Sequence, residues 1–254
     1  MPGSMFDPLA RDYDAARPSY PDGIFQALEE AAGPLAGQLV LDGGAGTGIA
    51  TRQLADRGAR TVAVDIGEQM LRRAQARSPG SSLLLADGNA LPLQDASIDL
   101  ACFAQSWHWF DHDRAPRELA RVLRPGGYWA AWWNMEWADG EEWYDAYQAE
   151  LESACAGYVR YVRRAPAPGW ADEPVAWTGR FEPATETAVG WTWTLDIARW
   201  LTYERSKSYV GGLPPADCEA LLSRIATIAA ARFPEGTMSV AFRTRLRLAR
   251  KGPG

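Results

Sequence analysis

The chain has 254 residues, 47% of them hydrophobic and 23% charged, which is enough for one α/β domain with a lid and a full hydrophobic core. Proteins that bind nucleic acids usually carry an excess of basic residues, whereas this chain has a net charge of −6. We therefore expect a small-molecule partner and no nucleic acid. Cys102, Cys155 and Cys218 lack metal-ligand spacing, so we expect reduced core thiols and no metal. No apolar run reaches about 18 residues, so we expect no signal peptide or membrane span, and a cytoplasmic protein.

The stretch from residue 39 to residue 48 predicts a strand, a tight turn and the start of a helix. It follows a short amphipathic helix around Phe25 and opens with three apolar residues, as buried parallel strands do. Glycines at positions 43, 44, 46 and 48 permit positive φ angles and close approach of a ligand to the backbone. The helical pattern from Thr47 to Arg57 then offers unpaired N–H groups, so we expect a nucleoside-type cofactor above this turn.

The spacing of the glycines narrows the type of cofactor. A dinucleotide fingerprint that used Gly44 and Gly46 would need a third glycine at position 49, where the chain has Ile49. Asp42, just ahead of the turn, would repel phosphate and suits a cationic ligand group such as an ammonium or a sulfonium. The spacing therefore disfavours a pyrophosphate-binding oxidoreductase.

Two further predicted strands end in an acidic residue. The strand Thr61–Asp65 closes with Asp65, about 20 residues beyond the glycines, where a carboxylate can accept hydrogen bonds from ribose hydroxyls. The alternative is that Asp65 caps the helix that follows. The strand 82–86 is followed by Asp87, Gly88, Asn89 and Ala90, and plain turn chemistry is the alternative to ligand binding there.

The fourth predicted strand, residues 100–104, runs into a segment rich in aromatic residues. Because strands one and four flank the point where strand order reverses, the segment after strand four faces the reacting centre. His108 lies there and is a candidate general base at neutral pH, the alternative being that it only hydrogen-bonds and orients the loop. Beyond a fifth strand at 128–133 we expect a helix at 143–154, a strand at 189–195, helices at 197–209 and 218–228, and a last strand at 238–248.

Four motifs carry a resemblance to a known family. They are Asp-x-Gly-x-Gly-x-Gly at 42–48, Tyr-Asp-x-x-Arg-Pro-x-Tyr-Pro at 13–21, Ala-Gln-x-x-His-Trp-Phe at 104–110 and Arg-Val-Leu-Arg-Pro-Gly-Gly at 121–127. Together they span about Phe6 to Asn134 and resemble the class I SAM-dependent methyltransferases, in particular the small-molecule type 11, trans-aconitate methyltransferase-like subgroup.

The resemblance implies a Rossmann-like α/β fold with a seven-stranded, mostly parallel sheet, an antiparallel last strand pair, helices on both faces and a helical lid. It implies one methyltransferase domain over residues 5–254. Within it we expect an N-terminal cap at 5–36, a SAM-binding core at 37–134, lid and substrate segments at 135–185 and 195–235, and terminal strands at 186–194 and 237–250.

The resemblance also implies which residues form the site. The cofactor, S-adenosylmethionine with S-adenosylhomocysteine as its product, would be bound by Tyr13, Arg17, Asp42, Gly43, Gly44, Ala45, Gly46, Gly48, Asp65, Ile66, Met70, Asp87, Gly88, Asn89, Ala90, Ala104 and Gln105. The substrate would be bound by Tyr20, Trp107, His108, Trp109, Trp133 and Asn134, with His108 as the catalytic residue.

The expected reaction is methyl transfer from SAM to an oxygen or nitrogen of a small acceptor, in a monomer or homodimer. The tryptophans near strands four and five suggest a flat aromatic or heteroaromatic acceptor, although ordinary core packing explains them equally well. The main alternative is a carboxyl O-methyltransferase, which needs no general base because a carboxylate is already ionised. A SAM-binding protein without catalysis is a third hypothesis.

Overall fold

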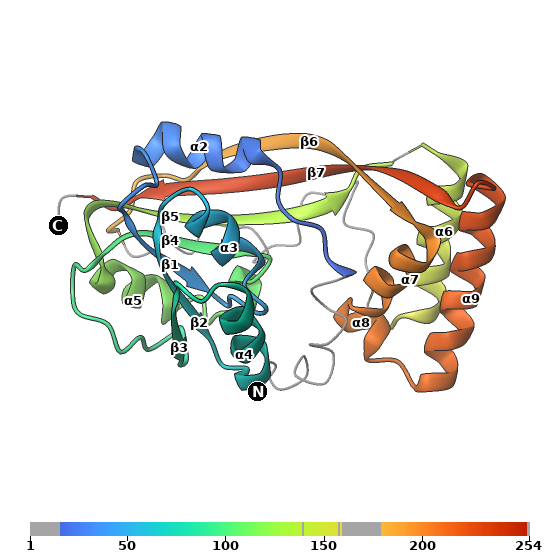
Figure 1. Cartoon of the computed structure of the whole chain (residues 1–254), viewed down its shortest axis with the longest axis horizontal. Coiled ribbons are helices and arrows are strands. Elements are labelled where there is room, and N and C mark those ends of the chain that lie inside the picture. Colours follow the sequence, from blue (N-terminus) through green and yellow to red (C-terminus); the bar gives the residue numbers. More distant parts are fainter. Residues whose placement is uncertain (1–15, 139, 157, 159–178, 253–254) are drawn as a thin grey trace.

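A mixed sheet of seven strands runs through this computed structural model, which describes residues 16–138, 140–156, 158 and 179–252 (Figure 1). The strands lie in the order β3-β2-β1-β4-β5-β7-β6, with β7 antiparallel to both of its neighbours and all other pairs parallel. This confirms the expected fold class. The strands are β1 Leu39–Gly43, β2 Arg60–Asp65, β3 Ser82–Leu85, β4 Ile98–Ala104, β5 Leu123–Glu136, β6 Thr185–Asp196 and β7 Thr237–Arg250.

Helices cover both faces of the parallel part of the sheet. Val40 and Leu41 are neighbours on β1 and point to opposite faces, as strand geometry requires. On one face Val40 packs in a buried cluster with side chains of α2 and α3, and on the other Leu41 packs with side chains of α5. The helices of this part are α2 Asp22–Ala32, α3 Ile49–Ala55, α4 Glu68–Arg77, the 3₁₀ helix η3 Trp107–Trp109 and α5 Ala115–Val122.

Two boundaries differ from the sequence prediction. Helix α3 begins at Ile49 and not at Thr47, because Gly48 has a φ of 79° and lies in the left-handed region. Strand β5 extends over 14 residues, further than the expected 128–133. Its Arg-Pro-Gly-Gly start stays paired, since Gly126 N–H donates to Lys251 O and Lys251 N–H donates to Gly127 O, at 3.0 and 2.7 Å.

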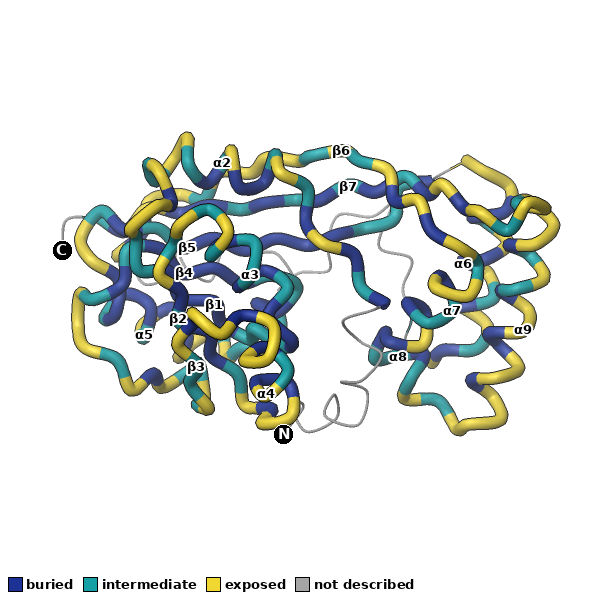
Figure 2. Tube along the Cα trace, in the orientation of Figure 1, coloured by how far each residue is buried: buried dark blue, intermediate teal, exposed yellow. Residues whose placement is uncertain are grey.

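Four further helices pack together at the far end of the long strands β5, β6 and β7, away from the parallel strands (Figure 1). They are α6 Glu142–Ala154, α7 Ile197–Arg205, α8 Ser208–Gly211 and α9 Pro215–Arg232. Their core is strongly aromatic and contains Trp200, Tyr144 and Tyr147, all buried. Figure 2 shows the central strands and the inward sides of these helices as mostly buried, with exposed residues on the outer turns and along the edge strand β6.

The expected single helix over 197–209 is divided into α7 and α8. The two residues between them, Ser206 and Lys207, are both buried, and Lys207 points into a polar cluster described below. Cys102, Cys155 and Cys218 are buried free thiols. Among the described residues, every helix is too short or too polar to cross a membrane.

Candidate active site

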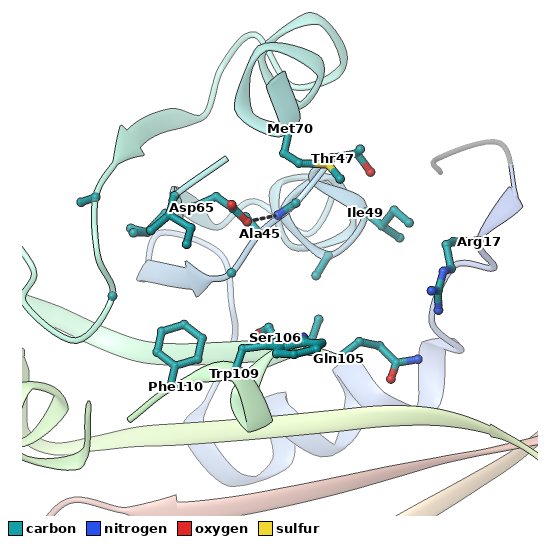
Figure 3. A pocket seen from close by; sticks show the side chains of 18 of the residues that line it. Arg17, Ala45, Thr47, Ile49, Asp65, Met70, Gln105, Ser106, Trp109 and Phe110 are labelled. Atoms are coloured by element: carbon teal, nitrogen blue, oxygen red, sulfur yellow. Dashed lines mark hydrogen bonds between the residues drawn. The ribbon is translucent and has the colours of Figure 1, made fainter. Parts of the chain in front are cut away.

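A cavity lies at the carboxyl ends of β1, β2 and β4, beside the point where strand order reverses (Figure 3). Backbone and side chains that follow these strands form its walls, and the chain ahead of α2 contributes Arg17 and Tyr20. It is lined by Arg17, Pro18, Tyr20, Gly44, Ala45, Gly46, Thr47, Ile49, Ala50, Val64, Asp65, Ile66, Met70, Ala86, Asp87, Gly88, Asn89, Ala104, Gln105, Ser106, Trp109, Phe110 and Asn134.

The glycine turn after β1 needs glycine for two different reasons. Gly44 and Gly46 have φ angles of 66° and 57°, which L side chains rarely adopt. A Cβ at Gly44 would also lie 2.6 Å from Ser106 Cβ, so a side chain cannot fit there without movement. No described residue lies within 4 Å of a Cβ placed at Gly46, which leaves room for a ligand above the turn in the part of the chain that the structure describes. The turn is thus a cradle that a Cβ would partly fill.

Asp65 ties the glycine turn to the end of β2. Its Oδ2 accepts a hydrogen bond from Gly46 N–H at 2.8 Å (Figure 3). Its Oδ1 accepts a hydrogen bond from Gly67 N–H at 2.7 Å. Gly67 is the residue just ahead of helix α4, and no side chain caps that helix. Asp65 therefore organises the turn and lines the cavity, where a carboxylate can also accept from hydroxyl groups of a ligand.

Asp42 lies behind the turn and does not line the cavity. Its side chain is fully buried, and its Oδ2 accepts a hydrogen bond from Thr51 Oγ1 at 2.6 Å. Burial, opposed in part by this hydrogen bond, raises the pKa of the Asp42 carboxyl to about 6. Its Oδ1 has no hydrogen-bond partner among the described residues. Gly43, beside it, is covered by the Phe103 ring, which a Cβ would approach to 2.4 Å.

The opposite wall of the cavity follows β3. Asp87 Oδ1 accepts from Asn89 N–H at 2.9 Å and from Asn89 Nδ2 at 2.7 Å, while Asn89 Oδ1 accepts from Asp111 N–H at 2.9 Å. These bonds join the wall to the loop after β4. Gly88 faces the Phe110 ring, which a Cβ would approach to 2.3 Å, so the close approach of Phe110 requires glycine here.

His108 lies outside the cavity lining. Its Nδ1 accepts a hydrogen bond from Trp133 Nε1 at 3.2 Å. Burial, with a smaller effect from His112, lowers the pKa of His108 to about 4. The imidazole is therefore neutral at physiological pH, and one of its nitrogens is already occupied by an indole N–H. Such a group is a weak proton acceptor, and the structure does not bring it to the cavity.

The three tryptophans expected at the acceptor have different positions. Trp107 is buried against Phe103, with ring centroids 4.6 Å apart, and Trp133 is also buried in the core. Only Trp109 lines the cavity, and 44% of its surface is exposed (Figure 3). Core packing thus accounts for Trp107 and Trp133, while Trp109 offers an aromatic face to a ligand.

The wall nearest the C-terminal helices carries amide and guanidinium groups. Gln105 has a φ of 59°, unusual for a residue other than glycine, and its Nε2 donates to Asn134 O at 3.4 Å. Strained backbone of this kind is found most often at functional sites. Arg17 Nη2 donates to Ser206 O at 2.9 Å and so joins the cavity to the segment between α7 and α8.

Most of the predicted site residues line one cavity, but not all. Asp42, Gly43, Gly48, Ala90, Trp107, His108 and Trp133 do not line it, and Tyr13 lies outside the described residues. Eight lining residues were not predicted: Pro18, Thr47, Ile49, Ala50, Val64, Ala86, Ser106 and Phe110. Each lies within or directly beside a motif that the sequence analysis used. Most of them are apolar, so their residue types alone do not indicate that they line a ligand cavity.

Comparison with known proteins agrees with this geometry. A family profile described as a methyltransferase domain matches residues 41–131. An uncharacterized methyltransferase of Mycobacterium tuberculosis (strain ATCC 25618 / H37Rv) is 45% identical over 122 residues, 48% of this chain and 49% of the relative. The structure of a candidate type II methyltransferase from Anaeromyxobacter dehalogenans superposes with a TM-score of 0.68 and 29% identity, covering 94% of this chain and 99% of that one. The chain belongs to the class I SAM-dependent methyltransferases.

Within this methyltransferase family, other relatives carry more specific names. A malonyl-(acyl-carrier protein) O-methyltransferase of Serratia marcescens is 32% identical over 172 residues, 61% of this chain and 66% of the relative. The chain spans about half the length of the first curated relatives that it matches. The glycine cradle and the Asp65 carboxylate beside it in the cavity wall fit a cofactor with an amino-acid end and a ribose, as this family uses.

Proposed function

We propose that this protein transfers the methyl group of S-adenosylmethionine to a carboxylate oxygen of a small acceptor. The observation that carries the proposal is the glycine turn closed onto Asp65 at the floor of the cavity. The positive φ angles of Gly44 and Gly46 bring the backbone of the turn against the cavity without side chains. The N–H groups of Gly44 and Ala45 donate to Val64 O and that of Gly46 donates to Asp65, so the turn is held rigid beneath open space. Such a cradle suits the amino-acid end of the cofactor.

Other residues of this chain would hold the remaining parts of the cofactor. The Asp65 carboxylate is placed to accept hydrogen bonds from ribose hydroxyls, and the wall of Asp87, Gly88 and Asn89 would bind the adenine. Bound S-adenosylmethionine would supply an electrophilic methyl group on a positively charged sulfur. Alignment of the acceptor with that methyl group can provide on the order of 7–11 kcal/mol of the rate enhancement, so positioning is the main task of the protein.

A carboxylate acceptor fits the position of His108 better than a phenol or an amine does. A carboxylate is already ionised at neutral pH, so its oxygen forms the new C–O bond as the C–S bond breaks, with no proton to remove. His108 has a pKa of about 4 and is not among the residues that line the cavity, although its ring centroid lies 4.8 Å from that of Trp109, which does line it. The low pKa makes His108 poorly suited to deprotonate an acceptor. The name of the Serratia marcescens relative, an O-methyltransferase of a malonyl group, supports the same class.

A flat aromatic acceptor is the second candidate. The observation that favours it is the exposed face of Trp109 in the cavity, on which an aromatic ring can stack. In either case we propose that α6 to α9 form a lid on the acceptor side, joined to the cavity through the bond from Arg17 to Ser206.

The test has two stages. Isothermal titration calorimetry with S-adenosylmethionine and S-adenosylhomocysteine measures cofactor binding, and binding of both is expected. Transfer of a tritiated methyl group is then measured on matched panels of small carboxylic acids, phenols and amines. Methyl esters as the main product support the proposal. Binding of neither cofactor form refutes the whole proposal, and exclusive methylation of phenols or amines refutes the carboxylate part.

A further inference from the structure

Asn134 lies near the end of β5 in the wall of the cavity, and a chain of hydrogen bonds holds its side-chain amide. Trp191 Nε1 on β6 donates to Thr244 Oγ1 on β7 at 2.8 Å, and Thr244 Oγ1 donates to Asn134 Oδ1 at 2.6 Å. The relay crosses three adjacent strands, and Asn134 and Thr244 are register partners of the β5–β7 ladder. Thr244, the central member of the relay, is fully buried.

The chemistry of the relay decides which end of the amide faces the cavity. An indole N–H can only donate, so the Thr244 oxygen is the acceptor in the first bond. The single hydroxyl hydrogen of Thr244 is then directed to Asn134 Oδ1. This leaves the Nδ2 group, which carries two hydrogens, on the other side of the amide. Nδ2 lies 3.5 Å from Ser19 O, a long hydrogen bond that a ligand oxygen can replace.

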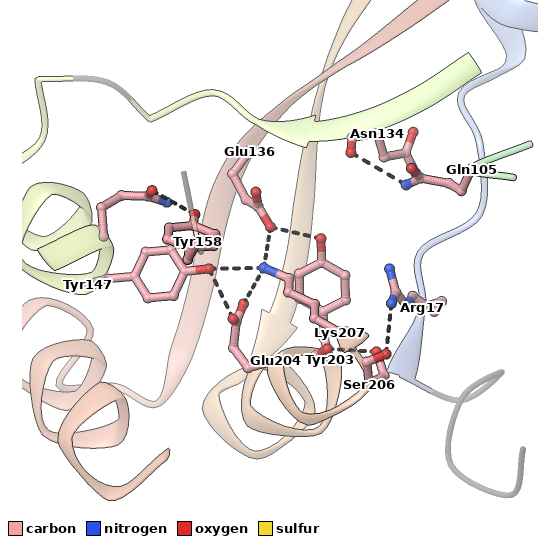
Figure 4. A network of polar contacts seen from close by, with 11 residues as sticks. Arg17, Gln105, Asn134, Glu136, Tyr147, Tyr158, Tyr203, Glu204, Ser206 and Lys207 are labelled. Atoms are coloured by element: carbon pink, nitrogen blue, oxygen red, sulfur yellow. Dashed lines mark hydrogen bonds and ion pairs between the residues drawn. The ribbon is translucent and has the colours of Figure 1, made fainter. Parts of the chain in front are cut away.

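The groups around Asn134 are also hydrogen-bond donors. Gln105 and Arg17 line the same wall, and their side chains carry amide and guanidinium N–H groups (Figure 4). The nearest carboxylate along the strand, Glu136, is two residues further from the cavity. Its Oε1 accepts from Lys207 Nζ and from Tyr203 OH, both at 2.7 Å. This carboxylate is thus paired with a cation and does not oppose an anion at the wall.

We infer that Asn134 binds an anionic oxygen of the acceptor through Nδ2, and that Thr244 and Trp191 are positioning residues that keep this donor turned toward the cavity. This deepens the proposed function, on which it rests, because it identifies the group that would recognise a carboxylate. A protonated amine has only donors and cannot accept from Asn134 Nδ2 or Arg17, although the Gln105 side-chain oxygen and the backbone oxygens of Ser19 and Asn134 are acceptors at this wall. The relay therefore favours carboxylates over amine acceptors.

Three variants separate the relay from the fold. Asn134→Asp keeps the oxygen that Thr244 binds and replaces the donor with an acceptor. Thr244→Val has nearly the same volume as threonine but lacks the hydroxyl, and Thr244→Ser is the matched control that keeps it. Trp191→Phe removes the indole N–H at a partly exposed position and serves if Thr244→Val does not fold. Circular dichroism and calorimetry with S-adenosylhomocysteine check that each variant folds and binds cofactor.

The probes are malonate, glutarate and benzoate, with benzylamine as the cationic counterpart, each titrated into protein saturated with S-adenosylhomocysteine. We expect at least one carboxylate to bind to the wild type and benzylamine not to bind. Loss of a hydrogen bond to a charged group corresponds to roughly 10- to 100-fold weaker carboxylate binding in Asn134→Asp. Thr244→Val should weaken it by about 5- to 10-fold and Thr244→Ser by less than about 2-fold, with cofactor affinity unchanged in all of them.

Carboxylate affinity in Thr244→Val and Trp191→Phe equal to that of the wild type would overturn the inference without touching the proposed function. Tighter binding of benzylamine than of any carboxylate, or no carboxylate binding to the cofactor-loaded protein, would overturn the inference together with the carboxylate part of the proposed function, but not methyl transfer itself. Absence of S-adenosylhomocysteine binding in the wild type would instead refute the proposed function. The two failures are therefore distinguishable.

Discussion

Replacement of His108 by asparagine tests the physical account of the loop after β4. In the structure, His108 Nδ1 accepts a hydrogen bond from Trp133 Nε1, and the imidazole is held neutral. The Oδ1 atom of asparagine occupies nearly the same position as Nδ1 and can accept the same bond. The variant therefore keeps the contact with Trp133 and removes only the group that titrates.

The size of the effect follows from the pKa of about 4, compared with an ordinary value of 6.5. As the pH falls below 6.5, the unfolded chain takes up a proton that the folded protein does not. Stability that is fully present above this pH is therefore lost progressively down to about pH 4. Between pH 7.5 and pH 5 the loss from this one group is about 2 kcal/mol, and His108→Asn should not show it.

Urea unfolding followed by tryptophan fluorescence at the two pH values measures this difference. The free energy of unfolding of the wild type should fall by about 2 kcal/mol more than that of His108→Asn over the interval. Equal losses in the two proteins would refute the assignment of a neutral, shielded imidazole. The variant should also keep methyl transfer at pH 7.5, because a fall of about 10²–10⁴-fold at intact cofactor affinity would restore His108 as a general base.

Three further predictions address the glycine turn, the carboxylate beneath it and the buried lysine. Gly44→Ala should weaken S-adenosylhomocysteine binding in calorimetry by at least about 10-fold, because its φ is positive and the new Cβ would meet Ser106. Asp65→Asn replaces an oxygen that accepts a backbone N–H and should weaken the same binding by roughly 10- to 100-fold, with a folded circular dichroism spectrum. Lys207→Met leaves two buried carboxylates without their cation and should lower the free energy of unfolding by about 3–5 kcal/mol in urea. Arg72→Met, which breaks only an exposed ion pair, is its control and should cost less than about 1 kcal/mol.

The polar cluster around Lys207 explains why that last effect should be large (Figure 4). Lys207 Nζ donates to Glu136, Glu204 and Tyr147 at 2.7–2.9 Å, and Glu204 is fully buried. Burial raises the pKa of Glu204 to about 7, although the lysine opposes the shift. Removal of the lysine would leave the fully buried Glu204 carboxyl facing the largely buried Glu136 carboxyl without a cation between them.

The glycine turn could be predicted because its chemistry is local. Gly44 and Gly46 are needed for the φ angles of their own residues, and the sequence shows them directly after an apolar run. The same applies to Asp65, which ends the next strand and binds the turn. The pattern also predicts that strands one and four flank the point where strand order reverses, and β1 and β4 are neighbours in the sheet.

The direction in which an individual side chain points could not be predicted in this way. Asp42 belongs to the most specific motif of the chain, yet its carboxyl lies behind the glycine turn and faces Thr51. The reason is that adjacent residues of a strand point to opposite faces. His108 lies in the expected loop but turns toward Trp133 on β5. Thr51 is 9 residues from Asp42 and Trp133 is 25 residues from His108, so both outcomes depend on how the following helix or strand packs.

The amino-acid sequence by itself determined the turn, the strand that precedes it and the acid that closes it, because each depends on φ angles and side chains within a short stretch. Only the tertiary structure decided that Asn134 meets Thr244, 110 residues away, and that Lys207 lies between Glu136 and Glu204. Those contacts come from the register of β5 on β7 and from the packing of α7 and α8 against the sheet. Neither leaves a periodic signal in the sequence, since any residue of suitable size can occupy the partner position.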